Sequence, residues 1–160
     1  MPAVRRPQWI ANVAGLALMV LFSPILLLVW IGYSFQYTWL AIRLRLAWPR
    51  GKFALVAYTD SPVWGTYIEE TLLPSISAHC VIVNRSTEGW KRAFRVESRA
   101  LSFWGRHLTS NPIALVLLRS GRVRVFHFHD AFLELKHGRP SSLESIVSQF
   151  VQCIHERVGA

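Results

Sequence analysis

No charged side chain occurs between residues 7 and 42, a run of 36 positions in a chain of 160 residues. About 20 apolar residues in a helix span the hydrocarbon core of a bilayer, and residues 9–30 supply that length. Apolar side chains would surround such a helix on all sides, and a soluble domain of this size could not bury them. The absence of charge therefore predicts a single transmembrane helix near the N-terminus.

A signal-peptide cleavage site is also missing. No small-x-small pattern follows Trp30, and the apolar run is longer than the h-region of a secretory signal. These features favour a retained anchor over a cleaved signal. Two crossings with a tip at Ser23-Pro24 would leave each arm shorter than a span requires. We therefore interpret Pro24 as a kink within one helix.

Acidic residues are absent from the first 52 positions, which hold six basic residues. Residues 53–160 hold twelve basic and nine acidic residues, a net charge of only +3 out of the total +9. The excess positive charge lies beside the predicted membrane, where anionic lipid attracts it, and this argues against a nucleic-acid partner. Four of the basic residues follow the apolar run and two precede it, which favours a cytoplasmic soluble domain.

The chain divides by composition into three parts. Residues 1–34 are predicted to form the transmembrane anchor with a short N-terminal tail. Residues 35–52 mix aromatic and basic side chains, which suits a juxtamembrane segment at the lipid interface or a continuation of the spanning helix. Residues 53–160 have the length of one compact domain.

Strand and helix patterns alternate in residues 53–160. Three apolar runs predict buried strands, and a turn then leads into a returning antiparallel strand. Helices are predicted after the cap candidate Asp60-Ser61-Pro62, in the arginine-rich middle of the domain, and after a capping box. The strands are expected at residues 53–58, 80–83, 113–118 and 123–129, and the helices at residues 62–74, 87–104 and from residue 141 onward. The order is β-α-β-α-β-β-α, an α/β domain.

This order resembles the core of the thioredoxin superfamily. Asn111-Pro112 precedes the third predicted strand, where the family carries a cis-proline, and Gly121 lies where the family places a turn glycine. The resemblance covers residues 53–157. It implies a thioredoxin-like fold with a four-stranded mixed sheet, helices on both faces of the sheet and a cis Asn111–Pro112 bond.

The chain departs from the redox-active members of that family because it has no Cys-x-x-Cys motif. The first strand-to-helix turn reads Tyr58-Thr-Asp-Ser-Pro-Val-Trp-Gly65, where those members carry Trp-Cys-Gly-Pro-Cys. Thiol–disulfide exchange requires an exposed thiolate at that helix N-terminus. Cys80 falls in a predicted buried strand and Cys153 in the last helix. We therefore expect no dithiol oxidoreductase activity, no catalytic residues and no cofactor.

These features predict a membrane-anchored, redox-inactive domain that acts as a protein-binding or assembly module. Its partners would be the lipid bilayer and a membrane or cytoplasmic protein. The expected contact surface is the end of the sheet that carries catalysis in the family, with Trp64 supplying an aromatic anchor. Its residues are Asp60, Ser61, Trp64, Asn111 and Pro112.

An alternative is a membrane-tethered enzyme that uses a metal at His127-Phe128-His129-Asp130. Alternate strand residues point to one side, so His127 and His129 could share an ion. Only Asp130 and His137 lie close in sequence as further ligands, and the apolar pattern of this strand requires a bulge near Val125. Two polar residues on an edge strand are the favoured interpretation, and no metal site is predicted.

Overall fold

The computed structural model describes the backbone of residues 8–105 and 111–159, with side chains from residue 20 onward. Contacts within the chain divide it into two units, Met1–Trp39 and Leu40–Ala160. The basic residues predicted to precede the span, Arg5 and Arg6, lie outside the described residues.

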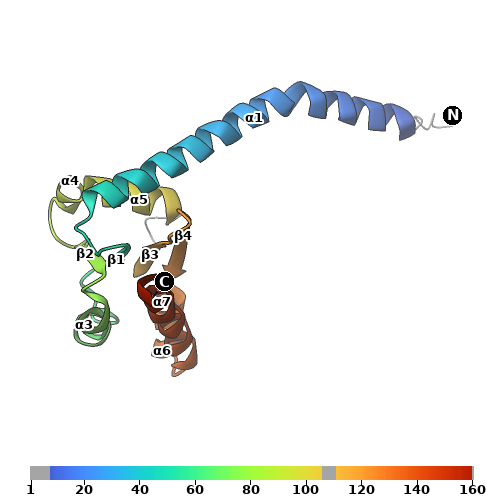
Figure 1. Ribbon diagram of the computed structural model, residues 1–160. Helices are drawn as coiled ribbons and strands as arrows, with labels where there is room; N and C mark the ends of the chain where they lie inside the picture. Colours follow the sequence, from blue (N-terminus) through green and yellow to red (C-terminus); the bar gives the residue numbers. More distant parts are fainter. Residues whose placement is uncertain (1–7, 106–110, 160) are drawn as a thin grey trace. The chain divides into compact units, whose positions relative to one another are not determined.

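Helix α1 runs over Gln8–Ala47 and continues through Pro24, so a hairpin at that proline does not form (Figure 1). In the first unit its large apolar side chains are exposed, including Leu21, Leu28 and Trp30. By length and composition, Val20–Ala47 is the one helix among the described residues that could cross a membrane. The predicted long apolar helix near the N-terminus is confirmed.

The last turns of α1 belong to the core of the second unit. Leu40, Ala41, Leu44 and Trp48 are all buried there. Arg45 lies in the same turns of the helix. Its Nη2 donates to the Leu118 carbonyl at 3.0 Å and to the Arg119 carbonyl at 3.3 Å. The sequence left two alternatives for residues 35–52, an interfacial juxtamembrane segment and a continuation of the helix. The helix continues through most of the segment.

The second unit contains one four-stranded mixed sheet, as predicted. Strands β1 (Ala54–Tyr58), β2 (Cys80–Asn84), β3 (Ile113–Leu117) and β4 (Val123–His127) lie in the order β2-β1-β3-β4. β1 pairs with β2 in parallel, and β3 runs antiparallel to both β1 and β4. The Asn111–Pro112 peptide bond before β3 is cis, as predicted.

One face of the sheet packs on helices from both halves of the domain. The alternate residues Ala54, Val56 and Tyr58 of β1 point to this face, as the strand period requires. Phe150 contacts two rings here, Phe126 at 5.2 Å and Phe128 at 5.7 Å between centroids. The covering elements are α2 (Gly65–Tyr67), η1 (Ile68–Leu72), α3 (Leu73–Ile76), α6 (His129–Lys136) and α7 (Ser141–Gly159).

The other face carries Leu55, Leu115 and Leu117, which are also buried. Helix α5 (Arg95–Trp104) covers this side together with the end of α1, and Figure 1 shows the two close together, away from α3, α6 and α7. A hydrogen bond from Trp48 to Glu97 links them. Helices therefore lie on both faces of the sheet.

Two predicted helices differ from those observed. The first begins at Gly65, and a π-turn interrupts it where the Leu73 N–H donates to the Ile68 carbonyl, five residues earlier. Pro74 follows directly. A proline has no N–H, so it cannot donate a hydrogen bond to the carbonyl four residues earlier in a regular helix. The second splits into α4 (Trp90–Ala93) and α5 because Phe94, at φ −115° and ψ 60°, is not helical.

Helix α6 was not predicted at all. The last strand was expected to continue through His129, but β4 ends at His127 and α6 starts at His129. Ala131 and Phe132 are buried on this helix, so tertiary packing stabilises a segment that is too short to fold alone.

Candidate functional site

Two of the five residues predicted as a partner surface, Asp60 and Asn111, lie at one end of the sheet, after β1 and before β3. The Asn84 side-chain amide donates to Asp60 Oδ1, and the Asp60 N–H donates to Ser86 Oγ at 2.9 Å. The Ser86 N–H in turn donates to Asn84 Oδ1, also at 2.9 Å. The turns after β1 and β2 are therefore held together by side chains.

Arg85 connects the same region to β3. Its N–H donates to the Tyr58 carbonyl at 2.7 Å, and its Nη1 donates to Asn111 Oδ1 at 3.0 Å. The guanidinium also lies over the Trp90 ring, 5.4 Å from the centroid. Burial lowers the pKa of Arg85. The Asn111 carbonyl lies 3.0 Å from His129 Nδ1, which joins α6 to the network.

Trp64 is half-buried and packs on α6. Its Nε1 donates to the Thr59 carbonyl at 3.1 Å, and its ring meets His129 edge-on at 5.9 Å between centroids. Val63 is the large apolar residue exposed beside it, at 39%. Part of the Trp64 ring therefore packs within the domain and is not accessible to a partner. Val63 adds exposed apolar surface that was not predicted from the sequence.

Of the predicted cap Asp60-Ser61, Ser61 closes the first turn, where its carbonyl accepts from the Gly65 N–H at 2.8 Å, and Asp60 does not act as a cap. The helix begins only at Gly65, and the Asp60 carboxylate is held by Asn84. Ser61 closes a local turn, in which its Oγ accepts from the Val63 N–H at 3.3 Å. Pro112 is buried, and its carbonyl accepts from the Phe128 N–H.

Both thiols lie away from this end and inside the domain. Cys80 is fully buried in β2, and Cys153 on α7 is 3% exposed. Burial raises the pKa of Cys80 to about 12, against a smaller opposing effect of Lys52. Burial also raises the pKa of Cys153, and Arg124 opposes that shift. Neither thiol has the exposure or the lowered pKa that exchange chemistry requires.

The two histidines of the alternative metal hypothesis lie on different elements. His127 ends β4 in regular register with Ile113, and no bulge occurs at Val125, which pairs with Leu115. His129 begins α6, and its ring nitrogen faces the Asn111 carbonyl. Within the described part of the chain, no three His, Cys, Asp or Glu residues are grouped as metal ligands.

Comparisons of this chain with protein-family models, with curated proteins and with solved structures gave no match. The chain combines one long apolar N-terminal helix with a mixed α/β unit. The end of the sheet around Asp60 carries the internal polar network, and Val63 is exposed beside it.

Proposed function

We propose that this chain is a membrane-anchored, redox-inactive thioredoxin-like domain that binds another protein or assists a membrane assembly. The strand order β2-β1-β3-β4, with β3 antiparallel to both its neighbours, supports the thioredoxin-like part of the proposal. The apolar helix α1 supports the anchor. The basic residues after the apolar run support a cytoplasmic domain.

One observation carries the functional part: a polar network occupies the turn where a redox enzyme of this fold has its thiols. Asp60, Asn84 and Ser86 hold the two turns in place, and Arg85 and Asn111 connect them to β3. A rigid, partly exposed surface loses little entropy on binding. This end is suited to recognition of a protein rather than to thiol exchange.

Photocrosslinking in native membranes tests this proposal. A photoreactive amino acid replaces Val63 in the full chain, and a matched control carries it at Ser145, an exposed position on α7. We expect a discrete crosslinked protein from position 63 and none from position 145. Asp60→Lys should reduce the yield at position 63, whereas Glu156→Lys on α7 should not. Equal adducts at both positions, or no adduct at 63, would contradict the proposed surface.

A further inference from the structure

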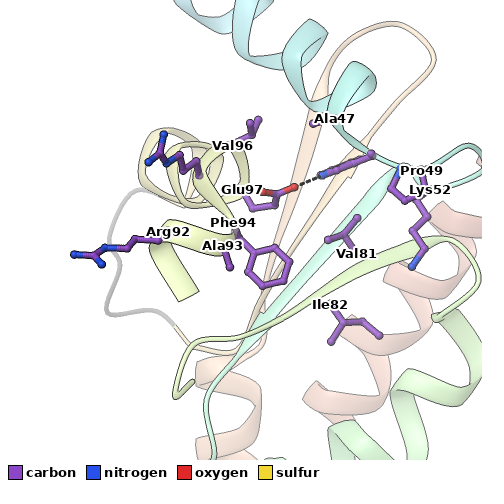
Figure 2. Close-up of a pocket in the computed structure, with 12 residues that line it drawn as sticks. Ala47, Pro49, Lys52, Val81, Ile82, Arg92, Ala93, Phe94, Val96 and Glu97 are labelled. Atoms are coloured by element: carbon purple, nitrogen blue, oxygen red, sulfur yellow. Dashed lines mark hydrogen bonds between the residues drawn. The ribbon is translucent and has the colours of Figure 1, made fainter. Parts of the chain in front are cut away.

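A second feature lies away from the polar end of the sheet. A pocket of about 590 Å³ opens between α5, the edge strand β2 and the segment that follows α1. Figure 2 shows Val81 of β2 and the Phe94 ring as an apolar wall of this pocket, whereas the Ile82 side chain points to the other face of the sheet. Its volume lies within the roughly 300–1,000 Å³ of small-molecule sites.

The floor of the pocket contains a buried carboxylate. Glu97 is 8% exposed, and its Oε1 accepts a hydrogen bond of 2.8 Å from Trp48 Nε1 (Figure 2). No donor among the described residues reaches its Oε2. Oε2 is not one of the buried atoms left without a partner among the described residues, so it is accessible from the pocket, and a carboxylate can accept through both oxygens. The floor is therefore suited to a ligand that brings an ammonium group or another N–H donor.

The mouth of the pocket is basic. Lys52, Arg92 and Arg95 line it, and no ion pair holds them among the described residues. Figure 2 shows the Arg92 guanidinium pointing away from Glu97, so it belongs to the mouth and not to the floor. Figure 2 shows Lys52 and Arg92 on opposite sides of the pocket, and a basic side chain at the mouth favours a ligand that also carries a phosphate or a carboxylate.

We propose that this pocket binds a zwitterionic amphiphile of the phosphoethanolamine class. The ammonium group binds Glu97, the phosphate lies among the basic side chains of the mouth, and the apolar part lies along Val81 and Phe94. This site goes beyond the proposed protein-binding surface and uses different residues. The ligand is either a membrane lipid, a source that rests on the proposed anchor, or a soluble phosphoethanolamine ester.

Calorimetric titration of the full chain in an uncharged detergent tests the proposal with three probes. Dihexanoyl phosphatidylethanolamine should bind, and dihexanoyl phosphatidylglycerol, which lacks the ammonium group, should bind at least about tenfold more weakly. Free phosphoethanolamine distinguishes the sources: an affinity equal to that of the lipid indicates a soluble ligand, and a weaker one indicates a lipid.

Two variants report on the site itself. Glu97→Gln keeps an acceptor for Trp48 but loses the charge, so the affinity for phosphatidylethanolamine should fall about tenfold to a hundredfold. Glu70→Gln, at an exposed carboxylate on η1, should leave it unchanged. Ala93→Trp fills the pocket from an exposed position and should abolish binding, whereas Ala78→Trp, at an exposed position outside the pocket, should not.

The outcomes separate this proposal from the protein-binding one. Wild-type affinity in Glu97→Gln and in Ala93→Trp would overturn the site, and so would equal binding of the two lipids. Should Glu97→Gln fail to fold, Ala93→Trp still decides. Crosslinking from position 63 should be the same in wild type and in Ala93→Trp, so either proposal can fail alone.

Discussion

Cys80 and Tyr58 are two residues whose proton affinity is changed most by folding. Burial raises the pKa of the Cys80 thiol to about 12. Burial and the hydrogen bond from Tyr58 to Glu69 raise the pKa of the phenol to about 12 as well. In both cases the folded chain holds a proton that the unfolded chain releases at lower pH, so alkaline solution favours unfolding.

The first prediction concerns this alkaline destabilisation. The contribution of the raised Cys80 pKa is complete below about pH 9, where the thiol of the unfolded chain begins to ionise, and is lost as the pH rises towards about 12. The urea midpoint of the full chain should therefore fall between about pH 9 and 11. Cys80→Ala should start lower, because it leaves a cavity, but should fall less steeply. Parallel curves for both proteins would contradict the assigned shift.

The second prediction concerns thiol chemistry. The full chain should not accelerate insulin reduction by dithiothreitol above the rate of the reagent alone, because both thiols are buried. A colorimetric thiol reagent at pH 8 should react slowly with the native chain and with two thiols in denaturant. Cys153→Ser should cost less stability than Cys80→Ser, since the charged Arg124 lies beside position 153 and can donate to a serine hydroxyl there. Turnover that disappears in either serine variant would show that a reactive thiol exists.

The sequence located the end of the sheet that carries Asp60, Trp64 and Asn111, because strand ends can be identified from apolar runs. It did not identify Arg85 or His129 as their neighbours. Arg85 is 26 positions from Asn111, and His129 is 18 positions from it, so only the folded topology brings them together. The burial of Pro112 also depends on elements that no local pattern contains.

At the scale of elements, the strands were predictable and the short helices were not. All four strands occur within two residues of their expected bounds, because continuous apolar runs mark β1, β2 and β3 and the turn at Gly121 marks the start of β4. The break at Phe94 and the helix α6 have no local signal of equal strength. For α6 the deciding interaction is tertiary, the burial of Phe132, which is 1% exposed.

The third prediction concerns the end of α5. Gly105 is buried there, and a Cβ at this position would overlap the Leu101 carbonyl oxygen and lie 3.1 Å from Ile113 Cδ1 of β3. Gly105→Ala should therefore destabilise the domain by about 1–3 kcal/mol, as measured by urea unfolding. Gly65→Ala is the matched control, because open space surrounds that position. It should be neutral or stabilising by up to about 1 kcal/mol. Equal effects would contradict the close packing of α5 on β3.

At the scale of the whole molecule, the second unit begins inside α1. The composition placed the domain start at residue 53, because the preceding residues are basic and aromatic. Contacts place the division between Trp39 and Leu40. No sequence pattern distinguishes buried Leu44 from Leu46, which is 82% exposed, because both lie in the same apolar and basic stretch.

The fourth prediction uses this pair of leucines. Leu44→Ala should cost about 2–5 kcal/mol of unfolding free energy, as for a large core residue. Leu46→Ala should change it by less than about 0.5 kcal/mol. A fragment that starts at Leu40 should fold cooperatively, whereas one that starts at Phe53 lacks Leu44 and Trp48 and should melt at a clearly lower temperature. Equal melting temperatures for the two fragments would contradict a core that includes the end of α1.

The fifth prediction concerns orientation. A reporter active only in the cytoplasm, fused after Ala160, should give signal, and a reporter active only outside it should not. The reason is the excess of basic residues after the apolar run over Arg5 and Arg6. Replacing Arg43, Arg50 and Lys52 by Gln should shift some molecules to the opposite orientation, with Arg139→Gln as the control. The reverse reporter pattern in wild type would place the domain on the other side.

The bond from Arg45 to Leu118 also sets an order of events during synthesis. The acceptor lies 73 residues after the donor in the chain. At about 5–20 residues per second, translation takes about 4–15 s to reach it. An interval of the same length therefore separates the emergence of Leu40 and Leu44 from the ribosome and the emergence of the hairpin turn that Arg45 contacts. The folding of the domain is therefore completed at a late stage of translation, and slow codons before residue 118 would prolong the exposure of two leucines to chaperones and to proteases.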